Sequence, residues 1–127
     1  MIINTPISLG ELVDKISILM IKKEKIKELE KLKFISKELQ MLNDVLKEYF
    51  KHNELDNYIN ELVKINTKLW EVEDEIRDCE RKKIFDNKFI ELARLVYFSN
   101  DQRSKIKLEI NQKFGSAIVE VKSYEDY

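Results

Sequence analysis

The apolar residues recur three or four positions apart along most of the chain, which is the spacing of amphipathic helices. A first helix begins at Ser8, which forms a capping box with Glu11, and ends between residues 27 and 30. The second ends before a turn at residues 51–53, and the third covers residues 54–81. The stripes of these three helices are Leu9, Leu12, Ile16, Leu19 and Ile26; then Leu32, Ile35, Leu39, Leu42, Leu46 and Tyr49; then Leu55, Tyr58, Ile59, Leu62, Ile65, Leu69, Val72 and Ile76.

A fourth helix starts at a cap on Asp86 or Asn87 and ends at Gly115. Its stripe is Phe89, Leu92, Ala93, Val96, Ile106, Ile110 and Phe114.

Three points of the helical pattern leave alternatives open. No glycine or proline separates the first two helices, so one long helix reaching Phe50 competes with two short ones. The dipeptide Asn100–Asp101 can cap a fifth helix. After Gly115, the β-branched run 118–121 predicts a short strand, which we expect to pair with residues 2–3 as a two-stranded clasp.

Composition favours an all-α fold. Two glycines and one proline are too few for the turns of a sandwich or barrel, whereas 37% charged residues suit long amphipathic helices. A length of 127 residues is typical of one domain. We therefore predict a single domain over residues 1–127, an antiparallel up-down four-helix bundle with short extended segments at both termini.

The charge balance argues against general electrostatic partners. The net charge of −1 predicts no attraction to nucleic acid or to a membrane surface, and no run reaches the ~20 apolar residues of a membrane span. The first residues lack a basic flank and an apolar core, so we expect a cytosolic protein. With a single cysteine, an intramolecular disulfide is impossible.

Several charged and polar side chains project where the helical stripes require apolar ones. Unpaired charges inside a small core cost many kcal/mol, so these groups must pair, reach water or bind something. Counting outward from the loops places many of them at one level of the bundle. The candidate ligand-binding residues are Lys15, Lys22, Trp70, Glu73, Arg77, Asn100, Arg103 and Lys107.

This layer has two interpretations. It is either an internal ion-pair network, with Glu73 bridging to Arg77 and with Glu80 and Asp74 attracting Lys22, Lys23 and Arg94, or a pocket for a small anionic metabolite. In the pocket, Arg77 and Arg103 would clamp the anion and Glu73 would act as a general acid or base. The all-helical chorismate mutases offer an analogy of fold and chemistry only, because their motif does not align with this chain.

Other chemistry has little support in the sequence. The acidic run 71–80 has the pattern of a solvated face, and we predict no metal site. His52 falls in a predicted turn, Cys79 has no histidine within one helical turn, and two glycines cannot form a phosphate-binding loop. We expect no cofactor.

Four blocks together resemble a family of short bacterial and phage proteins without an assigned activity. The resemblance implies one helical domain and carries over no catalytic residue or substrate. Met20 and Val121 depart from the family pattern, in which both positions are acidic. The blocks are residues 8–15 (SLGELVDK), 69–77 (LWEVEDEIR), 89–103 (FIELARLVYFSNDQR) and 115–124 (GSAIVEVKSY).

Three functions follow as hypotheses. The first is a non-catalytic interaction or assembly module, which we expect to be a homodimer because the apolar stripe of the second helix is wide for a thin bundle. The second is an enzyme or binder that holds a small anion in the polar layer. The third is an accessory subunit whose segment 118–124 docks on another protein.

Overall fold

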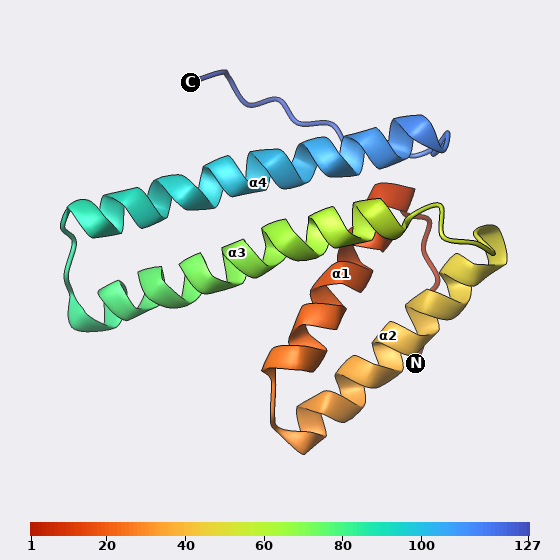
Figure 1. The fold of residues 1–127 in the computed structure, drawn as a ribbon, viewed down its shortest axis with the longest axis horizontal. Coiled ribbons are helices and arrows are strands. Elements are labelled where there is room, and N and C mark those ends of the chain that lie inside the picture. Colours follow the sequence, from red (N-terminus) through yellow and green to blue (C-terminus); the bar gives the residue numbers. More distant parts are fainter.

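The computed structural model describes residues 1–127 and contains four helices and no strand. The helices are α1 (Leu9–Lys25), α2 (Leu29–Tyr49), α3 (Asp56–Lys82) and α4 (Asn87–Lys113). They form two hairpins, α1–α2 and α3–α4, and Figure 1 shows the first hairpin crossing the second at a steep angle. The predicted all-α four-helix fold is confirmed.

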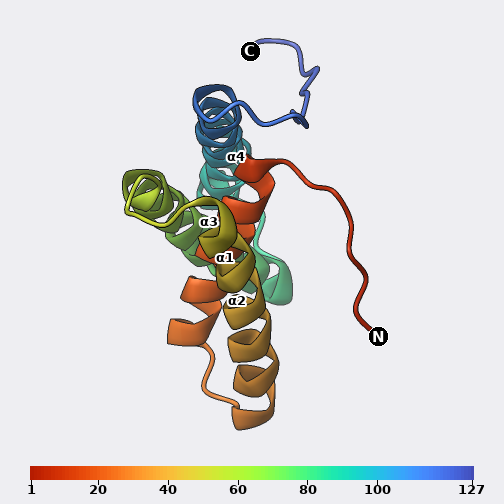
Figure 2. The same cartoon turned by 90° about the vertical axis from the view of Figure 1, so that its right-hand side faces the viewer.

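Helix α1 occupies the centre of this arrangement. It packs against α2 on one side and against both α3 and α4 on the other. The backbone of α2, in contrast, lies close to that of α1 alone, and the view along the long axis shows α2 projecting away from the α3–α4 hairpin (Figure 2). As a result α1 is buried around most of its circumference, whereas α2 is covered on one face.

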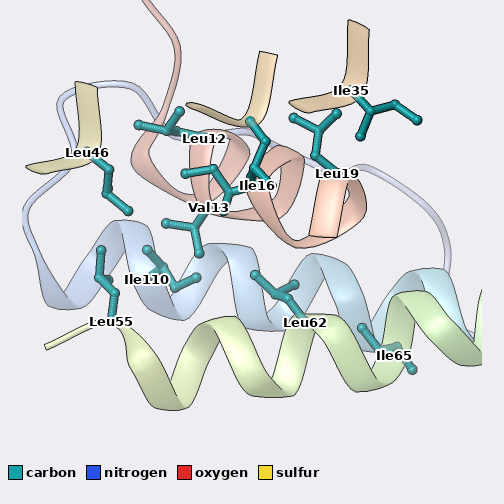
Figure 3. Close-up of a cluster of buried hydrophobic side chains, with 11 residues drawn as sticks. Leu12, Val13, Ile16, Leu19, Ile35, Leu46, Leu55, Leu62, Ile65 and Ile110 are labelled. Atoms are coloured by element: carbon teal, nitrogen blue, oxygen red, sulfur yellow. The ribbon is translucent and has the colours of Figure 1, made fainter. Parts of the chain in front are cut away.

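The core follows from this geometry. Figure 3 shows side chains of α1 in the middle of the cluster, between those of α2 and those of α3 and α4. The buried cluster contains Leu12, Val13, Ile16, Leu19, Ile35, Leu39, Leu46, Leu55, Leu62, Ile65 and Ile110. Every residue of this list except Val13 belongs to a stripe read from the sequence.

The residues at the ends of α1 show where this helix begins and where it separates from α2. The Ser8 hydroxyl accepts a hydrogen bond from the backbone N–H of Glu11 at 3.1 Å, so the predicted cap of α1 is confirmed. Ile26 and Glu28 are extended and separate α1 from α2, and the Ile26 side chain packs against the core. The single long helix is therefore wrong, because the break lets α2 fold back along α1 and bury Ile35, Leu39 and Leu46.

Helix α4 begins at its predicted cap, where Asp86 accepts a hydrogen bond from the backbone N–H of Phe89 at 3.2 Å. It runs without a break through Asn100, so no fifth helix forms. Gly115 ends it with a φ of 66°, a left-handed conformation that glycine adopts without steric cost.

The predicted two-stranded clasp is wrong, since neither terminal segment forms a strand. The start of α1 does lie beside the end of α4, because the backbone N–H of Leu9 donates to the Ser116 hydroxyl at 3.2 Å. Beyond that point the terminal segments diverge, as Figure 2 shows. An ion pair between Glu120 and Lys107 holds the C-terminal segment beside α4, away from residues 2–3.

Candidate functional site

A buried carboxylate, Asp14, lies where α1 crosses α3 and α4. Its side chain is 1% exposed, and the Arg103 guanidinium of α4 donates to it from Nε at 3.0 Å to both oxygens, with a further bond from Nη2. This contact raises the pKa of Arg103, because the hydrogen bond to Asp14 favours the charged guanidinium. A charge-assisted pair of this kind is what allows a carboxylate to be buried.

Helix α3 joins the same network through Asn66. Its amide nitrogen donates to Oδ1 of Asp14 and to the hydroxyl of Ser17, both at 2.9 Å. The Ser17 hydroxyl in turn donates to the backbone oxygen of Asp14 at 2.7 Å. Three helices are thus fixed in register by one carboxylate and its hydrogen bonds.

Lys107, one turn further along α4, forms a second centre. Its Nζ atom lies 2.7 Å from Oε2 of Glu11, 2.9 Å from Oε2 of Glu120 and 4.0 Å from Oδ2 of Asp14. Burial lowers the pKa of Lys107, but the hydrogen bonds to the two glutamates outweigh this effect, so its pKa is raised. The hydrogen bonds from Lys107 and then Lys122 lower the pKa of Glu120 to about 2.

The backbones of α1 and α4 approach closely beside this second centre. The N–H of Gly10 donates to Oδ1 of Asn111 at 2.7 Å, and a Cβ at position 10 would lie 2.5 Å from the backbone oxygen of Lys107. The absence of a side chain at Gly10 is therefore what lets Lys107 reach Glu11 and the C-terminal segment.

A cleft of about 430 Å³ opens next to the Asp14–Arg103 pair. It combines an apolar side with charged and amide groups from three helices. Five predicted site residues line it, namely Lys22, Trp70, Glu73, Asn100 and Arg103, and the remaining lining residues are Ile18, Ile21, Asn66, Leu69 and Asp74.

The other three predicted residues lie outside this cleft. Arg77 forms the predicted ion pair with Glu73, at 3.3 Å on an exposed surface. Lys107 belongs to the buried network, and Lys15 is exposed and forms no ion pair. The expected attraction of Glu80 for the lysines of the first helix is wrong, because Glu80 pairs with Lys83 at 2.9 Å.

Asp14, the central residue of the network, is not among the predicted site residues. The apolar stripe through Leu12 and Ile16 predicts one buried face for α1, but a helix covered on two sides has a second buried stripe. That second stripe runs through Gly10, Asp14 and Ser17, four and three residues apart, and all three are buried. The spacing of these three residues is the only indication of this second stripe in the sequence, because small and polar residues at helical intervals suit a close helix crossing.

The remaining chemistry is limited. No group of three His, Cys, Asp or Glu side chains lies close enough to hold a metal ion. His52 is exposed in the turn between α2 and α3, and Cys79 is half-buried and unpaired. None of the helices combines the length and the apolar character that crossing a membrane requires.

The comparisons with known proteins agree with the resemblance seen in the sequence. A model described as "Family of unknown function (DUF6165)" matches residues 3–127. Neither the curated proteins nor the solved structures contain a match to the chain. Residues of the first, third and fourth resemblance blocks meet around Asp14 and Lys107, among them Glu11, Arg103 and Glu120.

Proposed function

We propose that the chain, which belongs to the DUF6165 family of unknown function, is an assembly module that forms a homodimer through one face of α2. This face, called the α2 outer face below, consists of Phe34, Met41, Val45 and Tyr49. Their positions are separated by seven, four and four residues, so they share one side of the helix. Their exposed fractions are 75%, 37%, 42% and 74%.

The observation that carries the proposal is the lack of a partner for this face. The backbone of α2 approaches only α1, and only Ile35, Leu39 and Leu46 of α2 are buried. An amphipathic helix in a complete bundle covers its apolar residues against neighbours. Contiguous apolar side chains left in solvent are typical of a surface that binds another protein.

The accessible area of the chain supports the same interpretation. It is 9,491 Å², whereas a compact monomer of 15.2 kDa exposes ~7,100 Å². The difference of ~2,400 Å² exceeds the ~800 Å² that each partner buries in an interface of standard size. The exposed terminal segments, residues 1–7 and 117–127, and the open arrangement of the two hairpins both contribute to this excess, so surface is available for a second copy.

The pattern of the α2 outer face favours an antiparallel pair. In a parallel pair the Glu38 side chains of the two copies would face each other, and like charges repel. An antiparallel pair centred between residues 41 and 42 places Glu38 opposite Val45 and Phe34 opposite Tyr49. The interface is then isologous, as a two-fold dimer requires.

Sedimentation equilibrium over a wide range of protein concentration tests the proposal. The wild-type chain is expected to dimerise, and Phe34→Glu is expected to weaken the dimer roughly a thousandfold, because two copies each lose ~2 kcal/mol of apolar burial. Ile90→Glu is the matched control, since Ile90 is 53% exposed on α4. A wild-type chain that stays monomeric, or a control that disrupts the dimer as much as Phe34→Glu, would contradict the proposal.

A further inference from the structure

The cleft between α1, α3 and α4 contains two charged side chains of opposite sign that form no ion pair. Lys22 of α1 is half-buried and Asp74 of α3 is exposed, and both line the cleft. Most charged groups around them are compensated, because Arg103 contacts Asp14 and Glu73 contacts Arg77. A molecule that satisfies both free groups must carry a negative and a positive charge.

Two polar side chains that line the cleft, Asn66 and Arg103, retain hydrogen-bonding capacity. Asn66 is 6% exposed, and its amide nitrogen is fully engaged with Asp14 and Ser17, while its amide oxygen accepts no hydrogen bond from the protein. That oxygen stays accessible to solvent, because Ser99 Oγ is the only fully buried polar side-chain atom without a partner. On α4, Nη1 of Arg103 has only a 3.5 Å contact with Asn100, so it retains donors for a carboxylate.

The rest of the lining is apolar. Trp70, with Leu69 and Ile18, gives the cleft a side that fits a hydrocarbon or aromatic group. A volume of about 430 Å³ lies within the usual size range of small-molecule sites. The site thus offers separate surfaces for an anion, a cation and an apolar body.

We propose that this cleft binds a small zwitterion of the amino-acid type, with an apolar or aromatic side chain. Lys22 and the free face of Arg103 hold its carboxylate, and Asp74 holds its ammonium group. The apolar body packs against Trp70. This inference extends the anion pocket predicted from the sequence to a zwitterion, because Asp14 already neutralises Arg103. It does not depend on the α2 outer face.

The single tryptophan of the chain makes the proposal directly measurable. Trp70 lines the cleft, so its fluorescence reports occupancy without a label. Titration with L-phenylalanine is expected to give a saturable change, and isothermal titration calorimetry on the same samples provides a second readout. L-phenylalaninamide, which lacks the carboxylate, and 3-phenylpropionate, which lacks the ammonium group, are expected to bind at least ~10-fold more weakly.

Two variants test which side chain binds each charged group of the ligand. Lys22→Gln and Asp74→Asn are each expected to weaken L-phenylalanine binding ~10-fold or more. Lys23→Gln and Glu71→Gln are the matched controls, because both residues are exposed neighbours outside the cleft, and they are expected to leave binding unchanged.

Three results would overturn the proposal. The first is the absence of any signal by either method with L-phenylalanine, L-leucine and 6-aminohexanoate up to ~10 mM. The second is equal affinity for 3-phenylpropionate and L-phenylalanine, which would identify a simple anion site. The third is an unchanged affinity in both cleft variants.

Discussion

Removing the Arg103 guanidinium should destabilise the fold more than removing the charge of Asp14. Asp14 has a side chain 1% exposed, whereas the side chain of Arg103 is 27% exposed. Arg103→Leu leaves a buried carboxylate with one bond from Asn66 and a lysine 4.0 Å away, and breaking a buried pair in this way costs ~3–5 kcal/mol. Asp14→Asn keeps the shape of the side chain and leaves the guanidinium partly in water, so we expect a loss of ~1–2 kcal/mol.

The double variant distinguishes energetic coupling between Asp14 and Arg103 from the separate effects of the two substitutions. In Asp14→Asn combined with Arg103→Leu no buried charge is left without a partner, because Lys107 keeps Glu11 and Glu120, so its loss of stability should fall at least ~2 kcal/mol below the sum of the two single losses. Urea unfolding followed by far-UV circular dichroism measures each value, at one fixed protein concentration because dimerisation shifts apparent stability. Arg77→Leu is the control, since its exposed pair with Glu73 contributes less than ~1 kcal/mol.

Single losses that add within ~0.5 kcal/mol, as independent sites do, would contradict the coupling of Asp14 with Arg103. An Asp14→Asn loss as large as that of Arg103→Leu would contradict it as well. Either result would mean that Arg103 stabilises α4 through its packing and not through the buried charge.

Two other predictions concern the contacts around Lys107. Gly10→Ala is expected to destabilise the fold by ~1–3 kcal/mol in thermal or urea unfolding, because the added Cβ would lie 2.5 Å from the Lys107 carbonyl oxygen. A loss below ~0.5 kcal/mol would show that α1 and α4 separate easily. The pKa of Glu120 is lowered from 4.5 to about 2, so its contribution is complete above pH 4.5 and is lost as the pH falls toward 2. Because Glu120 is 38% exposed, solvent screening limits this contribution to ~1 kcal/mol, and Glu120→Gln should remove it above pH 4.5 but change little near pH 2.

The helices were predictable from the sequence because their determinants are local. The cap of α1 needs only Ser8 and its neighbours, and the end of α4 needs only Gly115. The core stripes likewise depend on spacing alone. The break between α1 and α2 was left open, since it depends on α2 folding back onto α1, which is a contact between segments and not a local signal.

The C-terminal segment shows where local propensity misleads. Three of the four residues 118–121 are β-branched and predict a strand, but a strand needs a partner with free backbone groups. The ion pair of Glu120 with Lys107, 13 positions away in the sequence, holds the segment beside α4. Nothing in the local sequence indicates that this lysine would be buried and would need a further carboxylate.

The central position of α1 explains why the apolar stripes of the sequence predict part of the candidate site but do not predict Asp14. A helix covered on one side has one buried stripe, and any charge off that stripe faces water. Helix α1 is covered on two sides, so Asp14 is buried although it lies beside the stripe of Leu12 and Ile16. Its burial requires a cation from the helix that crosses closest, and Gly10 is what brings that helix close. A short spacing of glycine, carboxylate and hydroxyl on one helix, with arginine and lysine four positions apart on another, therefore indicates a buried crossing and not a solvated face.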